Sequence, residues 1–251
     1  MRLGALLGII TDPTNPDALA EQARTLAGEG FDSLWTPQAI GRGFMMPDAL
    51  TMLTTAAAVT KDVEIGTAVL QLPLYHPVEL AHRVFSLMQL SGNRLTLGLG
   101  VGSTENDFIA FDRDYGARFK DFESRLQTLR EVFATGKHGE TDLSPWPAVQ
   151  GGPLLFFGTW GKNVVRAAQE FDGWIASGMH RTPDQVVAKI PEYREAGGKR
   201  AMVSTIQVSA QTDLGELKTT LDKYSEAGFD DAVVMILPGG PTPAEVRKLV
   251  Q

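Results

Sequence analysis

Short apolar runs alternate with longer amphipathic segments from one end of this 251-residue chain to the other. Eight runs are rich in apolar residues over most of their length, which is typical of strands buried on both faces. The runs lie at 3–10, 32–36, 63–70, 95–99, 154–158, 173–177, 202–209 and 232–237. The segments of helical period lie at about 17–29, 47–60, 77–90, 118–135, 162–171, 183–196, 213–227 and 242–250. Strict alternation of this kind predicts parallel strands joined by crossover helices.

Eight such units favour a closed (β/α)8 barrel, the TIM barrel, over an open doubly wound sheet. A length of 251 residues agrees with the roughly 250 residues typical of that fold. Neither a repeat nor a low-complexity linker divides the chain. We therefore predict one α/β domain over residues 1–251, with its site at the C-terminal ends of the strands, where barrel enzymes place their chemistry.

Composition excludes several classes of site and partner. The chain has no cysteine, which excludes disulfides, thiolate metal sites and cysteine nucleophiles. A formal net charge of −7 argues against nucleic-acid binding and against attraction to an anionic membrane surface. The four histidines lack metal-site spacing, so we predict no metal. The first apolar run is too short to span a membrane and no signal-peptide cleavage pattern follows it, so a cytoplasmic location is expected.

Two glycine-containing segments follow predicted strands. Gly98-x-Gly100-x-Gly102 has the start of a dinucleotide fingerprint, but Ser103 follows and no helix begins at once, which makes a Rossmann site a poor interpretation. In a barrel, Gly100 and Gly102 would let a ligand approach the backbone at the strand mouth. For Gly98, relief of crowding at the barrel rim is an equal alternative.

The second segment, Gly158-Thr159-Trp160-Gly161-Lys162-Asn163, leads directly into a predicted helix. It is not a P-loop, but a helix N-terminus presents free N–H groups and a partial positive charge to an anion. Lys162 adds a full charge, which Arg166 and Arg181 would extend. The alternative is an ordinary loop with an exposed lysine.

Five segments follow one another in order and at compatible spacing: Gly30–Trp35, Gly66–Leu70, Leu74–Val78, Leu90–Ser103 and Asp172–Ile175. Together they resemble the luciferase-like monooxygenase superfamily. The chain is most similar to the subgroup that binds coenzyme F420, a 5-deazaflavin hydride carrier, and FMN is the alternative cofactor.

The resemblance implies where this cofactor would bind. Its phosphate would lie at Gly158, Thr159, Gly161 and Lys162. Its ring would be backed by Thr67, Ala68 and Val69, where many members carry a bulge with a non-prolyl cis peptide. The remaining residues of the predicted cofactor site are Gly100, Gly102, Ser103 and Ser177.

Acid–base candidates are few. Many members of the superfamily place an acidic residue and a histidine after strand two, whereas this chain has Pro37 and Gln38, neither of which can shuttle a proton at neutral pH. Glu105 is the candidate acid or base, because a half-buried glutamate can be tuned towards neutral pH. A solvated carboxylate is the equal alternative. His76 is a further candidate for contact with cofactor or substrate, against a structural role at a helix start.

Aromatic and methionine residues in the loops predict a site for a hydrophobic molecule. They are Trp35, Phe44, Met45, Met46, Phe108, Phe111 and Trp160. For Met45 and Met46 the alternative is that they pack against the start of the second predicted helix. Phe108 and Phe111 lie three residues apart and are expected to form a short lid helix over the site.

Taken with the resemblance, these features predict an oxidoreductase that transfers hydride between coenzyme F420 and a small organic substrate. An FMN-dependent monooxygenase and a non-catalytic flavin- or deazaflavin-binding protein are the alternatives, together with a barrel enzyme for phosphorylated metabolites. The resemblance is compatible with a homodimer, and a flavin or deazaflavin reductase is expected to supply reduced cofactor.

Overall fold

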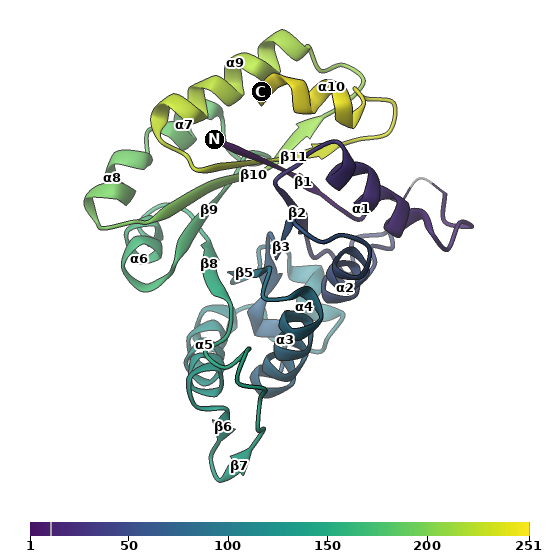
Figure 1. The fold of residues 1–251 in the computed structure, drawn as a ribbon. Coiled ribbons are helices and arrows are strands. Elements are labelled where there is room, and N and C mark those ends of the chain that lie inside the picture. Colours follow the sequence, from purple (N-terminus) through teal and green to yellow (C-terminus); the bar gives the residue numbers. More distant parts are fainter. Residues whose placement is uncertain (11, 251) are drawn as a thin grey trace.

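The structure is a computed structural model that describes residues 1–10 and 12–250, and it contains a closed barrel of parallel strands (Figure 1). The sheet order is β3-β2-β1-β11-β10-β9-β8-β5-β4, and pairing of β3 with β5 closes the ring. The barrel strands are β1 (Arg2–Leu6), β2 (Ser33–Thr36), β3 (Glu64–Thr67), β5 (Leu95–Gly100), β8 (Leu154–Gly158), β9 (Gly173–Ser177), β10 (Arg200–Val208) and β11 (Asp231–Ile236). The prediction of a (β/α)8 barrel is confirmed.

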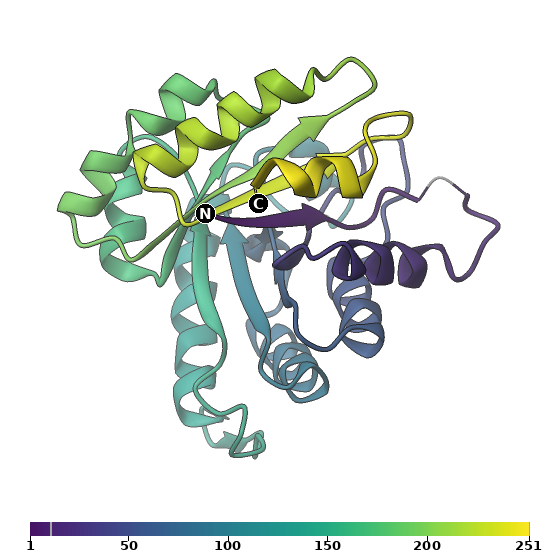
Figure 2. The ribbon, with the colours of Figure 1, turned by 45° about the horizontal axis from the view of Figure 1, so that its top comes forward.

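Helices surround the strands on the outside of the ring (Figures 1 and 2). They are α1 (Ala18–Gly28), α2 (Ala49–Val59), α3 (Pro77–Ser91), α4 (Glu105–Ile109), α5 (Arg118–Thr135), α6 (Asn163–Glu170), α7 (Pro183–Val187), α8 (Ile190–Glu195), α9 (Leu214–Ala227) and α10 (Pro243–Arg247), with 3-10 turns η1 (Leu72–Leu74) and η2 (Lys248–Val250). Side chains of Asp48 and Asp213 cap α2 and α9, and Thr182 and Thr242 form capping boxes at α7 and α10. No helix among residues 1–10 and 12–250 has the length and apolar character needed to cross a bilayer.

Several elements differ from the sequence-based expectation. The first strand ends at Leu6 instead of residue 10, and Gly8 then adopts a φ of +101°. The helix expected over 183–196 is divided into α7 and α8, with Pro191 in the first turn of the second. The loop after α5 contains an antiparallel hairpin, β6 (Lys137–His138) with β7 (Thr141–Asp142), which lacks any apolar alternation.

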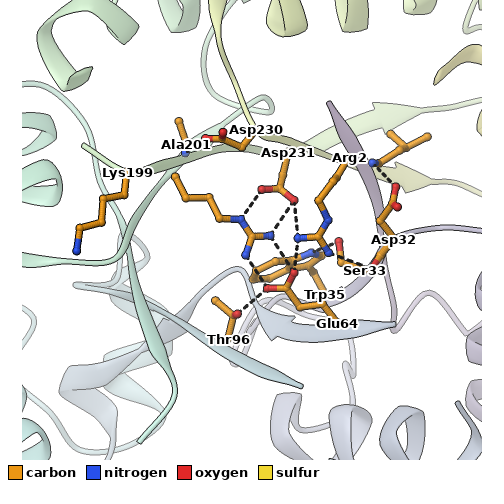
Figure 3. Close-up of polar contacts among 12 residues, drawn as sticks. Arg2, Asp32, Ser33, Trp35, Glu64, Thr96, Lys199, Ala201, Asp230 and Asp231 are labelled. Carbon is orange, nitrogen blue, oxygen red and sulfur yellow. Dashed lines mark hydrogen bonds and ion pairs between the residues drawn. The ribbon is translucent and has the colours of Figure 1, made fainter. Parts of the chain in front are cut away.

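The barrel floor is a network of charged side chains from the first residues of several strands (Figure 3). Arg200 bonds both oxygens of Asp231 and both oxygens of Glu64, at 2.6 to 3.0 Å. Arg2 lies 2.6 Å from Glu64, whose other oxygen accepts from the Thr96 hydroxyl at 2.6 Å. Burial alone would raise the pKa of Glu64, but Arg200, Thr96 and Arg2 together lower it.

An apolar layer lies above this floor. Side chains of a strand alternate between the two faces of a sheet, so Arg2 and Leu6 of β1 point inward while Leu3 and Ala5 pack against the helices. The inner layer comprises Leu6, Trp35, Phe156, Ile175, Met202 and Val233. These side chains fill the barrel up to the C-terminal ends of the strands, and the space above them is left for a ligand.

Candidate functional site

A cavity of about 490 Å³ lies at the C-terminal ends of the strands. It is within the size range of small-molecule sites, about 300–1,000 Å³. Eleven of the residues named as site candidates from the sequence line it: Gln38, Ala68, Val69, Gly100, Gly102, Ser103, Gly158, Thr159, Trp160, Ser177 and Arg181. The structure therefore brings together residues from strands that lie far apart in the sequence.

The floor of the cavity is formed by the broken third strand. The peptide bond between Ala68 and Val69 is cis, as the resemblance implies, and it separates β3 from its continuation β4 (Leu70–Gln71). The Val69 methyl groups lie against two glycines: a Cβ on Gly100 or on Gly158 would lie 2.6 Å from one of them. Any larger residue at either position would have to displace the Val69 side chain. Thr67 lies just beneath, fully buried, and its hydroxyl donates to the carbonyl of Gly98 at 2.7 Å.

One end of the cavity is suited to an anion, although not through all the residues predicted. Thr159 and Asn163 line it at the N-terminus of α6, where the first-turn N–H groups have no side-chain cap. Gly161 and Lys162 lie outside the lining, and Lys162 is exposed. Arg181 does line it, with its guanidinium 5.0 Å from the centroid of the Trp160 ring.

Arg166, expected to extend the positive charge of this end, does not do so. It is bound by the carboxylates of Glu123 and Glu170 on the outside of the barrel. These hydrogen bonds and charges raise its pKa further above its usual value. The charge available to an anion in the cavity therefore comes from Arg181.

Another wall of the cavity carries a hydrogen-bonded network that the sequence did not predict. Gln38 accepts from the backbone N–H of Gln71 at 2.7 Å and donates to the Tyr75 hydroxyl at 2.9 Å. Gln71 donates to Asp107 at 2.7 Å, and Arg42 binds the same carboxylate at 2.6 Å. Burial raises the pKa of Tyr75, which keeps this hydroxyl protonated. Gln38 therefore positions the wall of the cavity through neutral hydrogen bonds.

Two predicted acid–base residues lie outside the lining. Glu105 is exposed in the first turn of α4, and His76 is exposed at the N-cap of α3. Their catalytic assignment stays a prediction. His180 does line the cavity. In the part of the chain that the structure describes, no group of three or more histidine and acidic side chains is arranged as metal ligands.

The apolar lining also differs from the one predicted. Of the seven expected residues only Trp160 lines the cavity, because Trp35 fills the barrel interior and Phe108 is buried against Tyr115. The short helix α4 forms as expected, but Phe108 points into the protein. Phe119 and Met179 are instead the large apolar side chains at the cavity rim, 53% and 44% exposed.

Comparisons with known proteins point to one family. The model of the luciferase-like monooxygenases matches residues 4–229. The chain is 36% identical over 128 residues to 4-hydroxyprotoasukamycin monooxygenase of Streptomyces nodosus subsp. asukaensis. This match covers 50% of this chain and 34% of that protein. It is 30% identical over 200 residues to a putative coenzyme F420-dependent oxidoreductase of Mycobacterium tuberculosis, 70% of this chain and 55% of the relative. These two matches thus span about a third and about half of the relatives' own lengths.

A solved structure shows the same fold. An F420-dependent secondary alcohol dehydrogenase in complex with an F420-acetone adduct superposes with a TM-score of 0.81 at 17% identity. The superposition covers 99% of this chain and 98% of that one.

Proposed function

We propose, from the premise that the chain belongs to the luciferase-like monooxygenase family, that it is an oxidoreductase using coenzyme F420 for hydride transfer to or from a small organic substrate. The observation that carries the proposal is the cavity floor, where the Val69 side chain lies against Gly100 and Gly158 beside the cis peptide. When bound, coenzyme F420 would supply a 5-deazaflavin ring that accepts or donates hydride.

The residues present fit that cofactor by shape and by charge. Ala68 and Val69 would support one face of the ring, while Thr159, Asn163 and Arg181 would hold a phosphate at the α6 end. Phe119 and Met179 at the rim would exclude water from a bound substrate and favour a molecule with an apolar part. The homodimer and the reductase remain expectations from the resemblance.

FMN is the second candidate cofactor, because the relative with the highest identity reported above is a monooxygenase. The floor and the anion end described above fit a flavin ring and its phosphate equally well. With FMN the natural reaction is an oxygenation that needs a reductase as partner.

Binding titrations of the purified protein with coenzyme F420 and with FMN, followed by cofactor fluorescence, test the proposal. We expect micromolar or tighter binding of coenzyme F420 and binding of FMN at least tenfold weaker. Tight binding of FMN without binding of coenzyme F420 would identify FMN as the cofactor. Binding of neither would overturn the proposed function. A Gly158→Val variant is the control, because its side chain would occupy the floor beside Val69 and should abolish binding.

The prediction that Glu105 is an acid or base has a separate test. If it acts in this way, Glu105→Gln lowers kcat by about 100-fold or more and leaves cofactor affinity unchanged. Asp112→Asn is the matched control, because Asp112 is also exposed on the same loop and its φ of +50° is tolerated by asparagine. A kcat equal to that of the control would assign Glu105 as a solvated carboxylate.

A further inference from the structure

The orientations of two side-chain amides on the cavity wall are fixed by their partners. A backbone N–H can only donate, so the bond from Gln71 N identifies the near atom of Gln38 as its oxygen. A carboxylate held by a guanidinium can only accept, so the near atom of Gln71 facing Asp107 is its nitrogen. Neither amide can be rotated by 180° without placing two donors or two acceptors against each other.

This orientation leaves one strong acceptor without a donor in a residue that lines the cavity. The Oε1 atom of Gln71 is buried and has no hydrogen-bond partner among the described residues, and the residue as a whole is 3% exposed. It lies beside Gly102, where a Cβ would be 2.6 Å from it, and both residues line the cavity. A buried acceptor without a donor is costly to the fold, and the cost is relieved when a ligand supplies the donor.

The amide is also held rigidly. Asp107 is completely buried and binds four donors: the Gln71 amide, the backbone N–H of Ile40 and two nitrogens of Arg42, at 2.6 to 3.2 Å. These bonds tie the loop after β2 to α4 and to β4. The Gln71 oxygen is therefore preorganised, so a ligand meets it without an entropic cost for ordering the side chain.

We propose that Gln71 is a specificity-determining residue, whose Oε1 accepts a hydrogen bond from an N–H or O–H group of the molecule bound in the cavity. The inference rests on the proposed function. Two groups can donate this hydrogen bond: the imide N–H of a deazaflavin or flavin ring, and the hydroxyl of an alcohol substrate. A ligand that presents only a carbonyl oxygen at this position is rejected, because two acceptors would face each other in a buried site.

The test compares the wild type with Gln71→Met, which keeps the size of the side chain and removes the acceptor. The first arm titrates the cofactor that the wild type binds, coenzyme F420 or FMN, and its ring-N3-methylated analogue. If the donor belongs to the ring, the substitution weakens binding of the parent cofactor about tenfold. The methylated analogue then binds both proteins equally, and as weakly as the variant binds the parent.

The second arm uses cofactor-loaded protein and the pair cyclohexanol and cyclohexanone, followed by the change in cofactor fluorescence. If the donor belongs to the substrate, the wild type prefers the alcohol and Gln71→Met loses that preference, while cofactor affinity stays unchanged. Gln127→Met, an exposed position of α5, is the control and should match the wild type in both arms. Gln71→Leu is the second variant if the methionine variant does not fold.

Two negative outcomes are distinguishable. If the wild type binds a cofactor but neither arm depends on the residue at 71, the inference is overturned and the proposed function stands. If the wild type binds neither coenzyme F420 nor FMN, the proposed function fails and the inference fails with it.

Discussion

Arg200→Met is expected to lower the free energy of unfolding by about 3–5 kcal/mol, because the substitution removes the cation shared by two inward-pointing carboxylates. Asp231 is fully buried and the side chain of Glu64 is 15% exposed. Arg2 remains within 2.6 Å of Glu64 and 3.4 Å of Asp231, which places the expected loss at the lower end of that range. Urea denaturation followed by circular dichroism measures the change.

Arg83→Met is the matched control for this prediction. Arg83 faces Glu79 across one turn of α3 at 3.7 Å, and both side chains are exposed, so the expected loss is about 0.5 kcal/mol or less. Equal losses in the two variants would show that the barrel floor contributes no more than a surface ion pair.

Arg200→Met should also change how the free energy of unfolding depends on pH. The pKa of Glu64 is lowered in the folded protein, so the stabilisation from its ionised form is complete above its unfolded value of 4.5 and is lost as the pH falls through the lower folded value. Without Arg200, the largest influence that lowers the pKa of Glu64 is lost, so this pKa is higher in the variant than in the wild type. The loss of stability in Arg200→Met should therefore begin at a higher pH than in the wild type, in unfolding curves recorded between pH 7 and pH 3.

The barrel was predictable because burial of strands on both faces leaves a strong apolar pattern. The charged barrel floor was not, because its residues are at or beside the starts of strands that lie far apart in the sequence; Glu64 and Arg200, for example, are 136 residues apart. Arg2, Glu64, Arg200 and Asp231 each read as an ordinary polar boundary of an apolar run. Pairing of β1 with β11 places Arg2 beside Asp231, and closure of the ring by β3 and β5 brings Glu64 within reach of Arg200.

The candidate site was likewise predictable only in part. Gly100 was predictable because glycine at a strand end marks close approach, whereas Gly158 was expected at the cofactor phosphate and lies instead against Val69 on the cavity floor. Gln71 and Asp107 were missed because nothing in the sequence separates a buried amide or carboxylate from the exposed acids nearby, such as Glu105. Lys162 was expected at the anion-binding end of the cavity because it lies in the turn that leads into α6, but its side chain is exposed to solvent.

Gly98→Ala is expected to destabilise the protein by about 3 kcal/mol, at the upper end for insertion of one methyl group into a packed interior. The new Cβ would overlap the backbone carbonyl oxygen of Thr67 and lie 2.7 Å from the Cδ1 atom of Ile175. The two strands cannot separate easily, because the Thr67 hydroxyl donates to the Gly98 carbonyl and the pairing of β3 with β5 closes the barrel. Chemical denaturation of both proteins measures the loss.

This substitution should also weaken cofactor binding, although Gly98 does not line the cavity. Thr67 directly precedes the cis peptide between Ala68 and Val69, so displacement of its carbonyl moves the floor on which the ring would rest. Gly28→Ala is the control, because a Cβ at this helical position meets no atom within 4 Å and should stabilise the protein by about 0.5–1 kcal/mol. If Gly98→Ala lowers stability but leaves cofactor affinity unchanged, the position of Thr67 does not set the floor. A loss of both would show that the packing inside the barrel shapes the site above it.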